Sequence, residues 1–104
     1  MIGSKGAAEL SRKSTWTNLR ILNLGNNTID DTGAKDLSEN TTWANLRVLI
    51  LDCNVIRSEG AAALSKNTTW ISLQSLNLHG NHVGTAGIKT LKENIIWKNL
   101  IVSV

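Results

Sequence analysis

The sequence has no proline, phenylalanine or tyrosine and one cysteine among its 104 residues, yet it has four tryptophans. A random globular sequence rarely lacks three residue types while keeping four copies of the scarcest one. The single cysteine, Cys53, excludes an intrachain disulfide, so the fold is not that of a disulfide-stabilised scaffold. A reducing compartment is the simpler expectation.

The sequence also lacks a strong charge excess and a long apolar run. Eleven Lys and Arg residues against eight Asp and Glu residues give a net charge of +3, which is too weak an excess to indicate nucleic-acid binding. The opening MIGSKGAAELS has no apolar core of signal-peptide length, and no segment approaches membrane-spanning length. We therefore expect a soluble, cytoplasmic protein that binds neither nucleic acid nor membranes.

The sequence does contain a 27-residue repeat. Tryptophan recurs at this spacing at Trp16, Trp43, Trp70 and Trp97, and glycine does so at Gly6, Gly33, Gly60 and Gly87. Leucines follow the same period. One domain, residues 1–104, is thus divided into units 2–28, 29–55 and 56–82 and a partial unit 83–104. Such periods are typical of repeat proteins in which each unit buries the core of its neighbour.

The first half of each predicted strand-and-helix pair is an L-x-x-L-x-L-x-x-N segment. The three examples are LRILNLGNN, LRVLILDCN and LQSLNLHGN. This pattern is the leucine-rich repeat signature, in which the leucines point into the core. The closing residues Asn27, Asn54 and Asn81 are predicted to bond backbone groups at the turn that leaves the strand.

The second half of each pair is predicted to be a helix. The segments SKGAAELS, DTGAKDLS, SEGAAALS and TAGIKTLK begin with good N-cap residues, namely Ser4, Asp31, Ser58 and Thr85. Asn40, Asn67 and Asn94 follow the helices, where a left-handed residue could end each one. Asn26, Asn40 and Asn67 also open Asn-x-Thr triplets, which we interpret as structural features rather than glycosylation sites.

These features resemble the ribonuclease-inhibitor-like subclass of leucine-rich repeats, which includes the repeat regions of NOD-like receptors and of Ran GTPase-activating protein. The resemblance covers the whole chain. It implies a right-handed β/α solenoid with a parallel sheet on the concave face and helices on the convex face. The units are slightly shorter than usual, and the four tryptophans stand where the family has leucine. We interpret the whole tryptophan series as core residues, since it keeps the register of the other core positions.

Alternation along the strands predicts which residues face the concave side. Leu46, Leu49 and Leu51 point inward, so Val48 and Ile50 point outward. The repeat aligns the outward positions in rows: Ile21, Val48, Ser75 and Val102, then Asn23, Ile50 and Asn77. An apolar centre of Ile21, Val48 and Ile50 with a charged rim is typical of a protein-binding patch. The predicted binding residues are Arg20, Ile21, Asn23, Arg47, Val48, Ile50, Asp52, Gln74, Asn77 and His79. The alternative is that β-branched residues were chosen for strand propensity alone.

No set of residues predicts catalysis, a cofactor or a metal site. His79 and His82 lie three residues apart, but Asp52 and Cys53 would have to complete a metal site from the adjacent repeat. A polar cross-strand pair of Asp52 with His79 is the simpler interpretation. The negative charge of Asp52 beside Cys53 disfavours a thiolate, so an activated nucleophile is not expected. No phosphate-binding glycine motif is present.

The ends of the chain leave two alternatives open. Solenoids usually protect their terminal repeats with polar residues, but the last residues are LIVSV. Ser103 falls on an expected inward leucine position, whereas Ile101, Val102 and Val104 do not form a polar cap. The main prediction is a non-catalytic protein-binding module. The first alternative is a self-assembling or truncated repeat segment whose terminal strands pair with other copies. The second, by family analogy alone, is a regulator of an enzyme such as a small GTPase.

Overall fold

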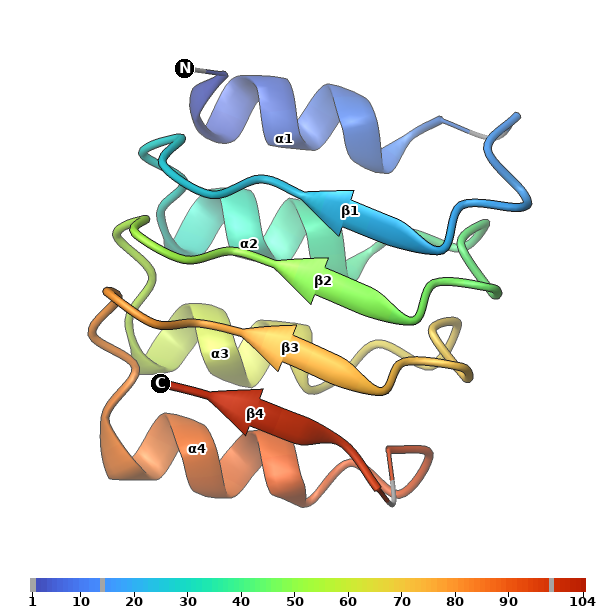
Figure 1. The fold of residues 1–104 in the computed structure, drawn as a ribbon. Helices are drawn as coiled ribbons and strands as arrows, with labels where there is room; N and C mark the ends of the chain where they lie inside the picture. The colour runs from blue at the N-terminus through green and yellow to red at the C-terminus, as the bar shows by residue number, and fades with distance from the viewer. Residues whose placement is uncertain (1, 14, 98) are drawn as a thin grey trace.

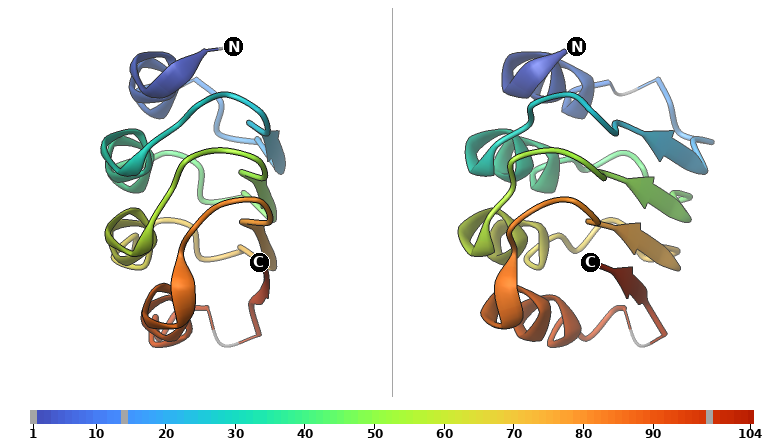
Figure 2. Two further views of the ribbon diagram at one scale, coloured as in Figure 1. Left: turned by 90° about the vertical axis from the view of Figure 1, so that its left-hand side faces the viewer. Right: turned by 60° about the vertical axis from the view of Figure 1, so that its left-hand side comes forward.

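The computed structural model describes residues 2–13, 15–97 and 99–104, and it shows four helices alternating with four short strands. The elements are α1 (Gly3–Ser11), β1 (Ile21–Asn23), α2 (Asp31–Ser38), β2 (Val48–Ile50), α3 (Ser58–Leu64), β3 (Ser75–Asn77), α4 (Gly84–Lys92) and β4 (Ile101–Ser103). The strands form one parallel sheet in the order β1-β2-β3-β4 (Figure 1). All helices cover one face of this sheet (Figure 2), as a β/α solenoid requires.

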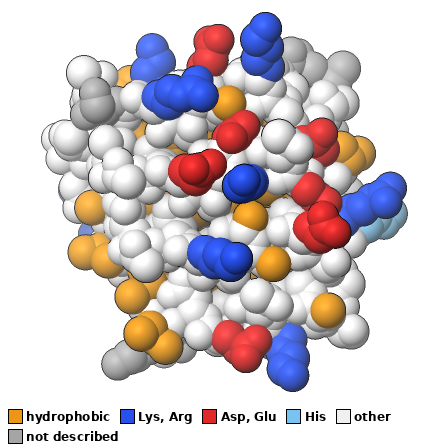
Figure 3. Space-filling view, turned by 180° about the vertical axis from the view of Figure 1, so that it is seen from behind, with side chains coloured by type: hydrophobic (Ala, Val, Ile, Leu, Met, Phe, Trp, Pro, Cys, Tyr) orange, Lys and Arg blue, Asp and Glu red, His pale blue; other side chains and the backbone are white. Residues whose placement is uncertain are grey.

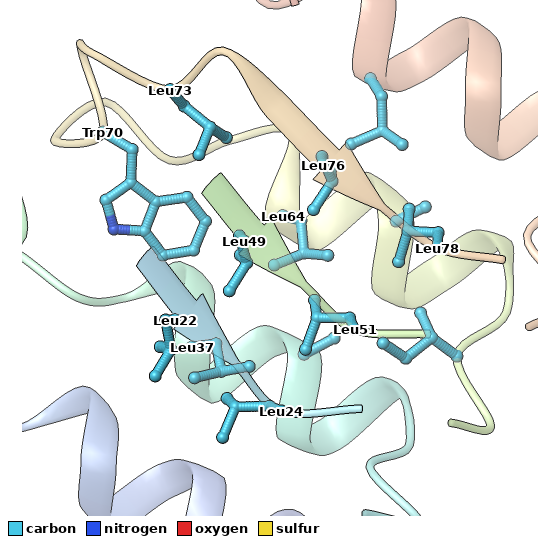
Figure 4. Packing of buried hydrophobic residues seen from close by; sticks show 14 of the residues in the cluster. Leu22, Leu24, Leu37, Leu49, Leu51, Leu64, Trp70, Leu73, Leu76 and Leu78 are labelled. Carbon is cyan, nitrogen blue, oxygen red and sulfur yellow. The ribbon is translucent and has the colours of Figure 1, made fainter. Parts of the chain in front are cut away.

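The repeated leucines form the core between the sheet and the helices. Strand leucines such as Leu49 and Leu76 and helix leucines such as Leu37 and Leu64 are fully buried and point toward one another (Figure 4). The alternation of side chains along each strand places the strand leucines on one face of the sheet. The period of about 3.6 residues in each helix places its leucine on the helix face that packs against them. The inward positions predicted for Leu46, Leu49 and Leu51 are confirmed.

Three of the four tryptophans form a buried stack, and the fourth does not. The rings of Trp43, Trp70 and Trp97 lie parallel, with centroids 6.4 Å apart at both steps. The prediction that the whole series is core is wrong for Trp16, which is 38% exposed. Trp16 belongs to the first repeat, and no earlier described repeat packs against it, whereas Trp97 in the last repeat is still covered by the ring of Trp70.

Asn54 shows how the predicted asparagine ladder works. Its side-chain oxygen accepts hydrogen bonds from the backbone N–H groups of Asn27 and Ile29, at 3.0 and 2.9 Å. Its side-chain nitrogen donates to the carbonyl oxygens of Leu24 and Leu51, both at 3.0 Å. Asn54 thereby satisfies backbone groups of two neighbouring repeats, which confirms the prediction.

The asparagines that follow the helices form a second ladder instead of left-handed caps. The residues with positive φ other than glycine, among those described, are Asn26, Thr28 and Cys53. Asn40 and Asn67 are buried, and the Asn67 side-chain nitrogen donates to the carbonyl oxygens of Ser38 and Asn40. The left-handed prediction was therefore wrong, because these amides bond to the backbone of the preceding repeat and need no special φ.

The second ladder also holds the tryptophan stack. The Trp70 indole Nε1–H donates to the Asn40 side-chain oxygen at 3.2 Å. Lys13 occupies the equivalent position one repeat earlier and has no amide. In the described part of the chain, the buried Trp43 Nε1 accordingly has no hydrogen-bond partner.

None of the four predicted N-cap residues precedes its own helix, and Asp31 caps a different helix from the one expected. Ser4, Asp31, Ser58 and Thr85 are the first or second residues of their helices rather than the residues before them. The Asp31 carboxylate accepts hydrogen bonds from the backbone N–H groups of Arg57 and Gly60, so it caps α3, one repeat further on. Helix starts stack side by side in a solenoid, which places the next helix within reach of a short side chain.

The cap of α2 provides a test of pH dependence. The pKa of Asp30 lies below its ordinary value of 3.8, because the Ser4 hydroxyl and then the Gly33 backbone N–H donate to its carboxylate. A lowered pKa in the folded state stabilises the protein above pH 3.8, and this contribution is lost as the pH falls through the lowered value. Asp30→Ala should reduce the free energy of unfolding by about 1 kcal/mol at pH 7 and by less near pH 2, in urea titrations at both pH values. An equal loss at both would contradict an ionised cap.

Strand β4 lies out of the expected register by a single position. Ser75 pairs with Ile101 and Leu76 pairs with Val102, whereas the repeat would pair Ser75 with Val102. Val102 therefore points inward against the core. The prediction that Val102 belongs to the outward row is wrong. Ser103 is exposed and does not take the inward leucine position. The shift replaces a hydroxyl on the inner face by a valine side chain, which favours apolar burial.

Candidate functional site

The candidate site is the outer face of the sheet, turned away from the helices. We define this sheet face by two rows of aligned residues: Ile21, Val48, Ser75 and Ile101, then Asn23, Ile50, Asn77 and Ser103. None of the ten predicted binding residues is buried. The strands thus bring the predicted outward residues side by side, and Ile101 takes the place expected for Val102.

The centre of the sheet face is apolar. Ile21 is 62% exposed and Ile101 is 67% exposed, at the two ends of one row. Val48 and Ile50 are half-buried between their strand neighbours. These four side chains have no helix above them, since all helices lie on the other side of the sheet (Figure 2). They can be covered only by another molecule or by water.

One rim of the sheet face lies where the strands begin. The Arg47 backbone N–H donates to the carbonyl oxygen of Arg20 at 2.7 Å, and the Gln74 N–H donates to that of Arg47 at 2.8 Å. The three predicted rim residues therefore lie on adjacent repeats, and all three are exposed. Two neighbouring guanidinium groups suit carboxylate partners, to which Arg can bond through two N–H groups.

At the opposite rim, Asp52 and His79 lie against different neighbours. The Asp52 carboxylate lies over Gly25 of the preceding repeat, where an added Cβ would collide with it. His79 Nδ1 lies 3.4 Å from the carbonyl oxygen of Val104. The side-chain oxygens of Asn23 and Asn77 accept hydrogen bonds from the backbone two residues ahead, at 3.0 and 2.9 Å. All four residues shape this rim, but the side-chain oxygens of Asn23 and Asn77 already accept hydrogen bonds from the chain's own backbone.

The arrangement does not assemble a metal centre among residues 2–13, 15–97 and 99–104. No cluster of three or more His, Cys, Asp and Glu side chains suited to a metal ion occurs there. Cys53 is exposed in the turn after β2. No helix in the described segments has the length and apolar character needed to cross a membrane.

The sequence interpretation missed one group of apolar residues, at the edge where the last two strands begin. Ile71 is 62% exposed and Ile95 is 83% exposed, and the neighbouring Ile96 is partly buried. The other repeats have serine or threonine at the position of Ile95 and threonine at the position of Ile96. This departure from the repeat was visible in the sequence, and it was the signal that could have found them.

Comparisons with known proteins agree with this geometry. The family model described as "Leucine Rich repeat" matches residues 17–38, 44–65 and 71–92. The solved structure of "Leiomodin-1 Actin-Binding Site 2 (ABS2)" superposes with a TM-score of 0.79 at 18% sequence identity, covering 96% of this chain. This chain spans only 61% of that one, and no curated protein matches its sequence. Because the family model matches more than half of the residues, the chain belongs to the leucine-rich repeat family.

Proposed function

We propose that this protein is a non-catalytic module that binds a protein partner through the sheet face. The observation that carries the proposal is the row of exposed or half-exposed side chains Ile21, Val48 and Ile101, next to Ile50, on the uncovered side of the sheet. Apolar centres surrounded by polar rims supply most of the affinity at protein interfaces. Arg20, Arg47, Asp52 and His79 would orient the partner.

Rigidity supports this role. The sheet face is backed by a fully buried layer of leucines and by asparagine ladders that link every repeat to the next. A preformed surface loses little conformational entropy when it binds. The full helix opposite each strand also supports membership of the ribonuclease-inhibitor-like subclass, and the cytoplasm fits a chain with one free cysteine.

The solved relative suggests a first partner to test. That relative is named as an actin-binding site of leiomodin-1, and at 18% identity its likeness concerns the fold alone. Purified actin should therefore be tested first, followed by proteins recovered from a cell extract on the immobilised chain. For whichever protein binds, we expect Val48→Asp and Ile50→Asp to weaken affinity about tenfold or more in calorimetric titrations, because each places a charge in the apolar centre.

The control is Val55→Asp, which adds the same charge in the turn after β2, where Val55 is 50% exposed. It should leave affinity unchanged, and circular dichroism should show all three variants folded. Equal affinity of Val48→Asp and the unmodified protein would contradict the proposal.

Self-association is a second candidate, because apolar side chains are exposed at both ends of the solenoid. Ile2 is 41% exposed at the first repeat, and Val104 is 52% exposed at the last. Light scattering of the same samples separates the two ideas. A mass above one chain that falls on dilution would favour pairing of terminal strands.

A further inference from the structure

A second surface, distinct from the sheet face, carries an inference about the chemistry of a partner. Ile71, Ile95 and Ile96, which we name the strand-start patch, lie where loops lead into β3 and β4. Figure 3 shows hydrophobic side chains gathered at its lower left margin, over these loops in the last repeats. Large exposed apolar residues are unremarkable singly, but a contiguous group marks an interaction site.

These isoleucines are not required by the fold. The positions equivalent to Ile95 are Thr41 and Thr68, and those equivalent to Ile96 are Thr42 and Thr69. The position of Ile71 holds Thr17 in the first repeat and Ala44 in the second. The same backbone therefore forms with smaller or polar side chains, and at 83% exposure Ile95 adds little to the core.

A hollow adjoins the strand-start patch and gives it a charge preference. Its volume is about 430 Å³, and its walls include Arg47, Ile71, Gln74, Ile96, Trp97 and Asn99. Arg47 is the one charged residue among its described walls, which include no carboxylate. An arginine beside the aliphatic side chains of Ile71 and Ile96 suits a group that is apolar at one end and anionic at the other.

The loop that carries the patch is held in place by the second asparagine ladder. The Asn94 side-chain nitrogen donates to the carbonyl oxygens of Ser65 and Asn67, at 2.8 and 3.0 Å. Its oxygen accepts the backbone N–H of Ile96 at 2.9 Å. The patch is thus preorganised, which lowers the entropic cost of binding.

We propose that the strand-start patch and Arg47 form a docking site for an acidic segment of a partner protein, in which an aliphatic side chain stands next to a carboxylate. The aliphatic side chain packs on Ile71 and Ile96, and the carboxylate accepts hydrogen bonds from the Arg47 guanidinium. The inference goes beyond the proposed sheet-face function, with which it shares Arg47 and the rim residue Gln74.

The test uses a terminally blocked pentapeptide that alternates glutamate with leucine, and the same peptide with glutamine in place of glutamate. Titration of the ¹⁵N-labelled protein should shift the Trp97 indole resonance and the Ile71 and Asn99 amide resonances. The glutamate peptide should bind about fivefold more tightly than the glutamine peptide, and Arg47→Gln should remove that difference. The double variant Ile71→Thr, Ile96→Thr should weaken binding about tenfold.

The control is Val55→Thr, which introduces the residue of the equivalent position Thr28 on the opposite edge and should leave binding unchanged. Equal binding of the two peptides, or undiminished binding by the double variant, would overturn the proposal. So would shifts confined to Val48 and Ile50, or none at all. Val48→Asp should not affect this peptide, so the failure of one proposal is distinguishable from the failure of the other.

Discussion

Replacing Trp70 with alanine should reduce the free energy of unfolding by about 3–5 kcal/mol. Trp70 is fully buried, and its ring lies between those of Trp43 and Trp97, at interplanar angles of 12° and 10°. The change leaves a cavity in the middle of the stack and also removes the hydrogen bond to Asn40. Small domains have a total stability of about 5–15 kcal/mol, so the variant should lie near its folding limit. Urea titration followed by far-ultraviolet circular dichroism measures the change.

Trp16→Ala is the matched control, because Trp16 has the same repeat position but is 38% exposed. It should cost less than about 1.5 kcal/mol, as expected for a partly exposed side chain outside the stack. A loss equal to that of Trp70→Ala would mean that the stack is not the source of the stabilisation. The pair of variants therefore separates stacking between repeats from the general effect of removing a tryptophan.

Asn54→Ala should cost about 3 kcal/mol or more, although it removes only a small polar side chain. Asn54 is 4% exposed, and its amide bonds backbone groups of its own and the preceding repeat. Alanine leaves the N–H of Ile29 and the carbonyl oxygen of Leu24 without this partner in a buried setting. Each unsatisfied buried group costs about 1–3 kcal/mol. Urea titration gives the loss directly.

The control is Asn99→Ala, since Asn99 is exposed in the loop before β4. It should change the free energy of unfolding by about 0.5 kcal/mol or less. If Asn54→Ala were equally mild, water would be able to replace the ladder amide, and the ladder would not link the repeats energetically.

Trp70 and Asn54 both stand at positions that recur in the repeat. The role of Asn54 could be predicted from the sequence, but the hydrogen bond of Trp70 could not. The Asn54 ladder was predictable, because an asparagine that closes each strand motif is placed to bond the backbone of the turn that follows the strand. The hydrogen bond of Asn40 with the Trp70 indole was not, because it joins side chains 30 residues apart through the stacking of two repeats. Likewise, the sequence predicted that Asp31 caps its own helix, α2, whereas Asp31 caps α3 in the next repeat.

The sequence by itself determined the succession of strands and helices, the inward leucines and the outward residues of β1 to β3. These follow from the short local periods of strands and helices, which recur in every unit of the repeat. Only the tertiary structure decided which members of each series are buried, that Ser75 pairs with Ile101 rather than Val102, and that Ile71, Ile96 and Arg47 lie around one hollow. The reason is that burial, register and grouping in a solenoid depend on the neighbouring repeat, and no single unit of sequence contains its neighbour.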